Sequence, residues 1–342
     1  MRRTRSAFLA AASFFGLSSL VIAASFGGCS FAWDGLDPRL GGGGIGGSGG
    51  MPGVGGGGGQ GGFGEGGAGG GAGGEGGQGG SGGQAPVLVD RGLLTRYYID
   101  EAASGEGPTT LVDSAPDPLA LDLDYGSVGG VGGGGGAGGA PAGPPNMGFV
   151  EVNGHRGLRW SIADQSGKAS AVVGGTKILG IDGATAATIE AVVAVEGGLP
   201  GTVCERIAHI GTNSNGSLTL CSEDGQRLDL RVNTMNGPFW SVGLPSLGRV
   251  VVHVVLDSSE ALAPDRAKLY LDGALVPASG GTPIPPGLTV ALTFGEYAIG
   301  NRVDSAASQQ GTIFYLAHYL TALTEQEVVN NAQVLAVSDD HP

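Results

Sequence analysis

Cysteine, basic side chains and charge in general are scarce in this chain. Its 342 residues include three cysteines, 17 lysines and arginines against 31 aspartates and glutamates, and only 14% charged residues. Three cysteines are too few for a small domain held together by many disulfides. The formal net charge of −14 argues against nucleic acid and anionic lipid headgroups as partners, because both bind basic surfaces. We interpret the diffuse acidity as favouring solubility, with the collection of divalent cations as the alternative.

Motifs for metal or nucleophilic chemistry are also missing. No His-Glu-x-x-His motif occurs, and no metal-ligand spacing relates the histidines at positions 155, 209, 253, 318 and 341. We therefore interpret each histidine as a hydrogen-bonded core or edge residue. Residues 46–50 and 79–83 match the nucleophile elbow formally, but they lack the flanking strand and helix that give this motif its strained turn.

Glycine, in contrast, is abundant, with 72 copies concentrated in residues 41–84 and 126–148. Such sequence cannot bury enough apolar surface to offset its ordering entropy. We therefore predict a disordered glycine-rich linker over residues 29–85 and a disordered Gly/Pro-rich surface insertion at 126–148, which loop-closure entropy tolerates. The rest of residues 86–342 is long enough for one β domain with a sizeable core.

The N-terminus has the pattern of a targeting segment. Basic residues in the first five positions precede an apolar run at 7–24, and small residues then lead to Cys29. This end resembles the lipobox of bacterial lipoproteins, although Phe26 stands where an aliphatic residue is usual. The resemblance implies a signal peptide over residues 1–28, a lipid on Cys29 and membrane attachment, at the outer membrane or cell surface. Ordinary secretion or an uncleaved anchor are the alternatives, and all three place the domain outside the cytoplasm.

The two remaining cysteines, Cys204 and Cys221, flank a predicted turn at residues 211–214. A four-residue loop there sets the two cysteines opposite each other on neighbouring strands. Cross-strand Cβ atoms are about 4.5–5.5 Å apart, which is close to what a disulfide requires. In an oxidising compartment we expect this disulfide, with two buried free thiols as the alternative.

Residues 268–276 give the strongest local signal in the sequence. Apolar residues alternate on both sides of Asp272-Gly273, a pair that accepts the positive φ angles of a type I′ hairpin turn. Short strand patterns separated by turn residues predict an all-β antiparallel sandwich or barrel. The patterns cover 171–173, 187–195, 206–210, 217–221, 227–232, 249–256, 268–271, 274–277, 288–294, 297–299 and 311–319.

One helix is predicted close to the C-terminus. Thr324 and Glu327 have the spacing of a capping box, which satisfies the first free N–H groups of a helix. Val328, Ala332 and Leu335 follow at intervals of four and three residues, so they form one apolar face. We expect this helix to close the sandwich.

The order of these elements resembles the LamG-like jelly-roll family of the concanavalin A-like lectin/glucanase superfamily. The resemblance covers about residues 88–340, although the tryptophan that often begins the strand at 249 is absent here. It implies an antiparallel jelly-roll β-sandwich with a short C-terminal helix. The segments that carry it are 92–101, 111–114, 188–193, 206–211, 249–256, 268–276, 297–300 and 311–328.

The resemblance implies a non-catalytic cell-surface module that binds a polysaccharide or a surface protein. Glycosidases of this superfamily carry a Glu-x-Asp-x-x-Glu run on one strand, which aims the carboxylates into one cleft. This chain has no such run: Asp122 and Asp124 come nearest, and Glu190 is a lone strand carboxylate that we interpret as structural. A polysaccharide-degrading hydrolase or lyase and a structural envelope protein without a specific ligand are the alternatives.

Calcium is the one cofactor that the resemblance to the LamG-like family implies. Related folds hold it at the sandwich rim, where Asp182, Asn301 and Asp304 are the candidates by loop position. The alternative is that all three are ordinary turn residues. Among aromatic residues, Phe239, Trp240 and Tyr297 are candidates for a sugar-stacking face, with a place in the core as the alternative.

Overall fold

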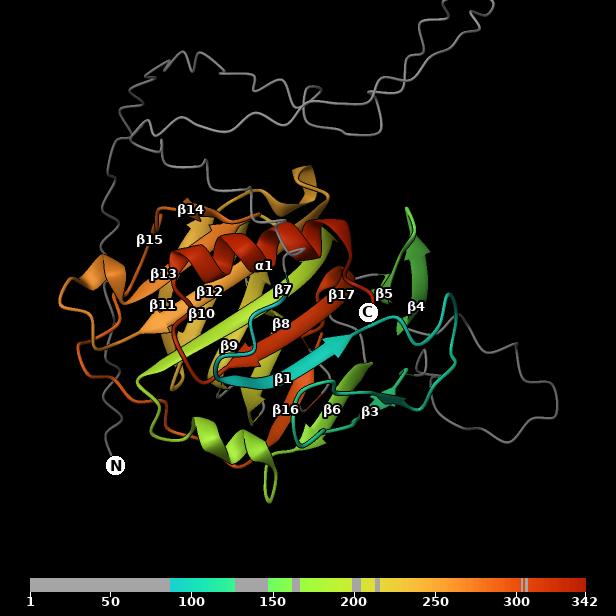
Figure 1. Cartoon of the computed structure of the whole chain (residues 1–342), viewed down its shortest axis with the longest axis horizontal. Coiled ribbons are helices and arrows are strands. Elements are labelled where there is room, and N and C mark those ends of the chain that lie inside the picture. The colour runs from blue at the N-terminus through green and yellow to red at the C-terminus, as the bar shows by residue number, and fades with distance from the viewer. Residues whose placement is uncertain are drawn as a thin grey trace, which may run out of the picture. The chain divides into compact units, whose positions relative to one another are not determined.

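Two antiparallel β-sheets packed face to face carry the described part of the chain, residues 87–126, 147–161, 167–198, 204–212, 216–302, 304 and 307–342 of a computed structural model (Figure 1). The predicted signal segment with Cys29, the linker, and residues 127–146 of the predicted insertion lie outside these ranges. The fold class predicted from the sequence, an all-β sandwich with one C-terminal helix, is confirmed.

Sheet A has the strand order β14-β13-β12-β7-β17-β5-β4, and β1 also pairs with β17. Its strands are β1 (Leu93–Tyr98), β4 (Met147–Val152), β5 (His155–Trp160), β7 (Ala186–Gly197), β12 (Arg249–Asp257), β13 (Ala267–Leu271), β14 (Ala274–Val276) and β17 (Gln310–Tyr319). The long central strands β7 and β12 are rich in valine, and β17 is rich in aromatic and aliphatic residues, because both faces of these strands are buried.

Sheet B has the strand order β15-β11-β10-β9-β8-β16-β6-β3-β2. Its strands are β2 (Thr110–Leu111), β3 (Leu121–Asp124), β6 (Lys168–Val172), β8 (Glu205–Gly211), β9 (Gly216–Glu223), β10 (Arg227–Val232), β11 (Met235–Ser241), β15 (Gly280–Gly281) and β16 (Glu296–Ile299). Short 3₁₀ turns at η2 (Lys177–Ile181), η3 (Leu244–Ser246) and η4 (Ala263–Asp265) connect strands.

Along β10, apolar and charged residues alternate, and this pattern decides which side chains point into the core and which point away from it. Leu228, Leu230 and Val232 are buried in the core between the sheets, which also holds Trp160 and Trp240. The residues between them, at 227, 229 and 231, belong to the opposite surface of the strand, because successive side chains in a strand point to opposite faces.

The hairpin predicted at residues 268–276 is confirmed. Leu271 pairs with Ala274 across the turn, and Asp272 and Gly273 have φ angles of 48° and 81°. Asp272 also accepts a hydrogen bond of 2.9 Å at Oδ1 from the backbone N–H of Val251. The turn residue therefore also ties the hairpin to β12.

Helix α1 (Glu325–Val337) covers the outer surface of sheet A, as the red helix across the strands in Figure 1 shows. Its capping box is present: the Thr324 hydroxyl accepts from the Glu327 N–H, and the Glu327 carboxylate accepts from the Thr324 N–H. The predicted apolar face of Val328, Ala332 and Leu335 is buried against sheet A. None of the helices in the described ranges has the length and apolar character that a bilayer crossing requires.

Three sequence expectations need correction. Residues 288–294 were expected as a strand, but they form no ladder; the N–H groups of 291, 292 and 293 instead bond to the side chains of Asn233, Asp182 and Ser217. Strand β11 was not expected at all. Strand β4 begins at Met147, so the last two residues assigned to the insertion belong to sheet A.

Candidate functional site

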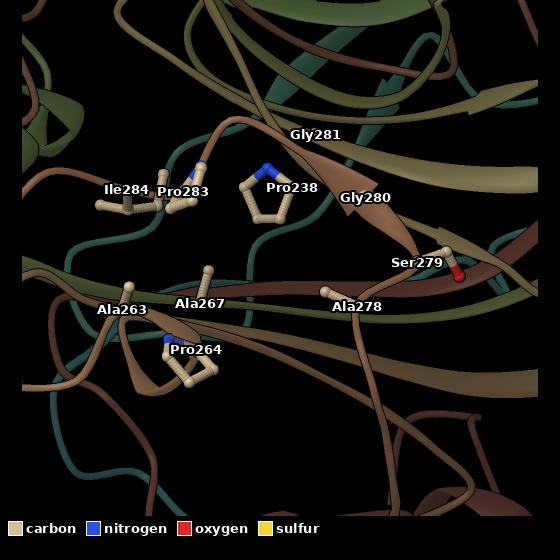
Figure 2. A pocket seen from close by; sticks show the side chains of 10 residues that line it. All are labelled: Pro238, Ala263, Pro264, Ala267, Ala278, Ser279, Gly280, Gly281, Pro283 and Ile284. Carbon is tan, nitrogen blue, oxygen red and sulfur yellow. The ribbon is translucent and has the colours of Figure 1, made fainter.

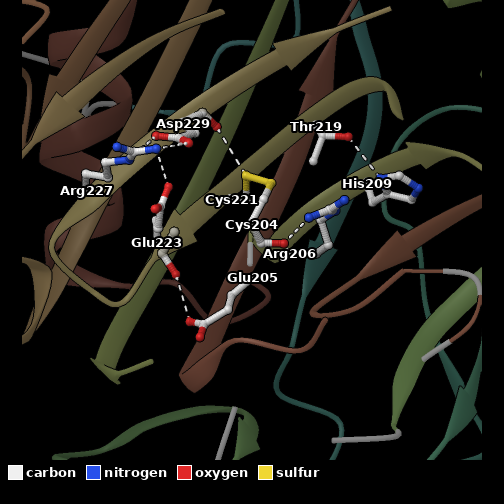
Figure 3. The surroundings of a disulfide bond; sticks show 10 residues. Cys204, Glu205, Arg206, His209, Thr219, Cys221, Glu223, Arg227 and Asp229 are labelled. Atoms are coloured by element: carbon white, nitrogen blue, oxygen red, sulfur yellow. Dashed lines mark hydrogen bonds and ion pairs between the residues drawn. A yellow bond between two sulfur atoms is a disulfide. The ribbon is translucent and has the colours of Figure 1, made fainter. Parts of the chain in front are cut away.

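The outer surfaces of the two sheets differ in what covers them. The α-helix of the described residues lies on sheet A, whereas the outer surface of sheet B carries polar side chains along four neighbouring strands. We call this surface the disulfide face. It consists of Cys204, Arg206 and His209 at β8, Thr219, Cys221 and Glu223 of β9, Arg227, Asp229 and Arg231 of β10, and Phe239 of β11. Figure 3 labels these residues except Arg231 and Phe239.

Strand register arranges the disulfide face in two rows. In one row, Arg206 is opposite Cys221, and Cys221 is opposite Asp229. In the next row, His209 is opposite Thr219, and Thr219 is opposite Arg231. Because the rows are adjacent, Arg206 and Arg231 lie diagonally across β9.

The disulfide between Cys204 and Cys221 is present, with a Cα–Cα distance of 5.2 Å, so this pairing is confirmed. The register that suggested it was wrong. The predicted loop at residues 211–214 would pair residue 210 with residue 215, but Gly211 pairs with Gly216 instead. This different turn position makes Arg206 rather than Cys204 the cross-strand partner of Cys221. Both cysteines are buried. The bond indicates an oxidising, extracytoplasmic compartment.

Along β10 and β11, the disulfide face contains an arginine that packs on an aromatic ring and pairs with two carboxylates. The Arg227 guanidinium lies 4.6 Å from the centre of the half-buried Phe239 ring, a distance at which a cation is attracted to the ring face. The same guanidinium forms ion pairs with Glu223 and, at 2.9 Å, with Asp229. The ring and three charged groups are thus held in one arrangement.

Along β8 and β9 the face is deeply buried. Nε2 of His209 donates to the carbonyl of Thr212 at 3.1 Å, so Nδ1 accepts from the Thr219 hydroxyl at 2.9 Å. Burial, with the nearby charge of Arg206, lowers the pKa of His209 to about 4. His209 is therefore neutral at physiological pH and contributes no charge to the face.

Two guanidiniums of the disulfide face form no ion pair with a carboxylate among the described residues. Arg206 is 2% exposed; its Nη1 donates to the carbonyl of Cys204, and its Nε has no acceptor in the part of the chain that the structure describes. The Nε of Arg231 also has no acceptor, and this side chain forms no ion pair with a described residue. Burial foremost, with the nearby charges of Arg231 and Arg302, lowers the pKa of Arg206 to about 9.

The aromatic candidates from the sequence separate into two groups. Trp240 and Tyr297 are fully buried in the core, so they are not available to stack on a ligand. Phe239 is the one that reaches the disulfide face. A second ring, Phe294, was not foreseen: it is 73% exposed and lies before β16, near Val172, which is 67% exposed.

The lone strand carboxylate, Glu190, is at the centre of a closed network beneath α1. Its oxygens accept from His253 at 2.8 Å, Asn331 at 2.7 Å, Tyr315 at 2.7 Å and Tyr319 at 3.0 Å. Burial alone raises the pKa of Glu190, but the hydrogen bonds, that of His253 foremost, lower it overall. Its structural interpretation is confirmed.

A pocket of about 290 Å³ opens between η4 and the strands β11 and β15 (Figure 2). Its lining is prolines, alanines, glycines and one isoleucine, with Ser279 as the single polar side chain. Such a lining offers no group for acid–base chemistry, so the pocket does not add to a catalytic site.

The three calcium candidates already have protein partners. Oδ1 of Asp182 accepts from the Leu292 N–H, Oδ1 of Asn301 accepts from the N–H groups of Arg302 and Ala307, and Asp304 pairs with the Arg302 guanidinium. The described ranges contain no group of three or more His, Cys, Asp or Glu side chains that could hold a metal ion. As arranged, these residues do not fit the ion, and calcium binding stays a prediction.

The carboxylates nearest to a glycosidase pair, Asp122 and Asp124, are exposed on the edge region of sheet B. Asp122 is opposite Ser170, and Asp124 is opposite Lys168 in β6. Lys168 itself forms a 2.6 Å ion pair with Glu296 of β16.

No family model and no curated protein matches this sequence. Among solved structures, Trypanosoma rangeli sialidase is similar with a TM-score of 0.45 and 14% identity, over 72% of this chain and 33% of the sialidase. The binding domain of botulinum neurotoxin DC, in complex with SialylT, has a TM-score of 0.46 and 8% identity, over 72% of this chain and 52% of that domain.

Domain 4 of AbnA, a GH43 extracellular arabinanase from Geobacillus stearothermophilus in complex with arabinotriose, has a TM-score of 0.43 and 16% identity. The alignment covers 70% of this chain and 98% of that domain. The chain therefore spans about a third of the sialidase and about half of the neurotoxin domain. With TM-scores below 0.5, these likenesses do not establish a shared fold.

Proposed function

We propose that this protein is a non-catalytic carbohydrate-binding module of the cell exterior, and that the partly exposed side of the disulfide face, at Arg227, Arg231 and Phe239, contacts a polysaccharide. The unit of Arg227, Phe239, Glu223 and Asp229 is the observation that carries this proposal. The Arg227 guanidinium covers one face of the Phe239 ring, so the other face is the one left to pack on the apolar C–H face of a sugar, while the sugar hydroxyls bond to fixed guanidinium and carboxylate groups. Because ion pairs already hold these groups, little side-chain entropy is lost on binding.

A binding role is favoured over hydrolysis by the positions of the acidic residues. Glu190 is fully buried beneath α1, and both of its oxygens accept from protein donors. Asp122 and Asp124 are exposed on a sheet that carries no third carboxylate at the family spacing. We therefore propose that the chain is not an enzyme, with a hydrolase or lyase as the competitor.

The proposal also includes a location outside the cytoplasm. The disulfide supports an oxidising compartment, and the sequence of the N-terminus supports a lipid anchor on Cys29. The order of the strands and the closing helix agree with a LamG-like jelly roll. In this view the polypeptide holds the sandwich away from a membrane surface on a glycine-rich linker.

Binding of the full chain to an immobilised panel of neutral and acidic polysaccharides tests the proposal. We expect at least one polymer to be bound, and we expect Phe239→Ala to weaken this binding about tenfold, as loss of a central aromatic contact does. Val337→Ala is the matched control, because Val337 is 78% exposed on α1, on the sheet A side. Arg227→Gln is a second variant of the same unit.

Each other outcome of the panel contradicts the proposal in a different way. A panel that stays empty favours a structural envelope protein, and shortened polymer chains favour a hydrolase or lyase. Equal binding by Phe239→Ala, Arg227→Gln and the unchanged protein places the contact elsewhere. Parallel runs with calcium and with a chelator check the calcium prediction for Asp182, Asn301 and Asp304.

A further inference from the structure

The disulfide face concentrates unpaired positive charge in a strongly acidic chain. Among the described arginines and lysines, almost all form an ion pair with a carboxylate, and Arg266 instead donates to three backbone carbonyls. Arg206 and Arg231 are the exceptions, and they lie on the same face. With a formal net charge of −14, the chain has no shortage of carboxylates to pair with them.

Arg206 and Arg231 are close enough in the sheet for their charged groups to act on the same ligand. Arg206 and Arg231 are separated by β9 and by two residues along the strands, so their backbones are about 12 Å apart at the usual strand spacing and rise. Long side chains bridge such a distance. Arg206 is 2% exposed, whereas Arg231 is partly exposed, so Arg231 is the more accessible of the two guanidiniums.

A buried guanidinium without an anion is an unfavourable arrangement. Arginine stays protonated at physiological pH even here, since burial brings the pKa of Arg206 only to about 9. Its Nε donor has no acceptor within the described ranges, and an unsatisfied buried donor costs free energy that a bound anion restores. The arrangement is complementary to a carboxylate, which accepts two parallel bonds from a guanidinium fork.

We propose that the polysaccharide bound by the disulfide face is acidic, and that Arg231 binds the carboxylate of a uronate-type sugar with Arg206 as a second positive charge behind it. This inference rests on the proposed function and names the ligand class of the same site. In this arrangement the ring of Phe239 contacts the sugar face while Arg231 bonds to its acid group. Arg302, paired with Asp304, lies at the border of the charged region.

Matched polymers separate the acid group from the rest of the sugar. Polygalacturonate is compared with its fully methyl-esterified form, which keeps the same backbone without the charge, and dextran sulfate is compared with dextran. We expect the full chain to bind polygalacturonate at least about tenfold more tightly than the ester, the effect of one charge-assisted contact. We expect higher salt to reduce this difference.

Substitution of Arg231 identifies the contact. Arg231→Gln is expected to lose about tenfold in affinity for polygalacturonate and to leave the ester unchanged, and Arg231→Lys to fall between. Arg156→Gln is the control, because Arg156 is an exposed arginine of β5 in sheet A, ion-paired with Glu151. Thermal unfolding of each variant confirms that it is folded.

Four results overturn the inference. Equal affinity for the acid and the ester removes the role of the carboxylate but leaves carbohydrate binding in place. Unchanged binding by Arg231→Gln excludes this residue as the contact. Preference for dextran sulfate over polygalacturonate contradicts the assignment to a carboxylate. Absence of binding to every polymer overturns both the inference and the proposed function.

Discussion

Replacement of Glu190 with alanine is expected to lower the free energy of unfolding by about 3–5 kcal/mol, the cost of breaking a buried ionic and hydrogen-bonded group by removing one partner. Four donors lose their acceptor at once: His253, Asn331, Tyr315 and Tyr319. All four residues are fully buried between sheet A and α1. The variant also leaves a cavity where the side chain was.

Urea denaturation of the full chain measures this loss, with Glu196→Ala as the control. Glu196 is on the same strand, β7, but its side chain is 38% exposed and pairs with Arg159 at the surface. Its loss is expected to cost less than about 1 kcal/mol. Equal destabilisation by the two variants contradicts the structural role of Glu190.

The Glu190 network also determines how stability depends on pH. The folded protein lowers the pKa of Glu190, so this carboxylate binds its proton less readily than in the unfolded chain. Its contribution to stability is therefore complete above the unfolded pKa and is lost as the pH falls through the folded pKa. Glu190→Ala is expected to flatten this part of the acid-unfolding curve.

Loss of the disulfide is the second large effect. The bond joins residues separated by 17 positions, for which the loop-closure model gives a stabilisation of about 3 kcal/mol. The double variant Cys204→Ser with Cys221→Ser is expected to lose about this amount in urea denaturation. The free energy of unfolding of the unchanged protein is expected to fall similarly in reductant, whereas the double variant should not respond to reductant.

The same disulfide also supports the ligand site. Cys204 precedes Arg206 by two residues, and its carbonyl accepts a hydrogen bond from that guanidinium. Opening the bond is therefore expected to weaken polygalacturonate binding as well as stability. Full stability of the double variant would show that the sandwich does not depend on the bond.

Local signals in the sequence were sufficient for the elements that depend on few residues. The Asp272-Gly273 turn and the Thr324–Glu327 cap are determined by neighbouring backbone groups, and both appear as predicted. The alternation in β10 likewise separates core and surface positions without further information. A two-layer β fold follows from many such segments.

The disulfide face could not be predicted, because it depends on which strands become neighbours. Arg206 and Arg231 are 25 positions apart by number, and only the order β8-β9-β10 together with the β8 bulge places them on one surface. The register of the cysteine pair was missed for a different reason, since Gly211 pairs with Gly216 and the turn is not the predicted loop at 211–214. The composition gave no indication of the disulfide face either, because a net charge of −14 says nothing about where individual arginines lie in the fold.

The pattern of apolar residues also predicted one strand that does not form. Residues 288–294 have strand-like composition, but their N–H groups find side-chain acceptors on Asn233, Asp182 and Ser217. Periodicity records which side chains are buried and does not record whether a ladder partner exists. This loop nevertheless matters for the surface, since it contains the exposed Phe294.

Hydrogen exchange of the full chain with and without polygalacturonate tests the central claim most directly. Our account predicts that bound polymer slows exchange at the amides of β9 and β10, around Thr219 and Arg231, and leaves α1 and the outer surface of sheet A unchanged. Protection confined to α1 and sheet A, or no protection although the polymer is bound, would contradict it.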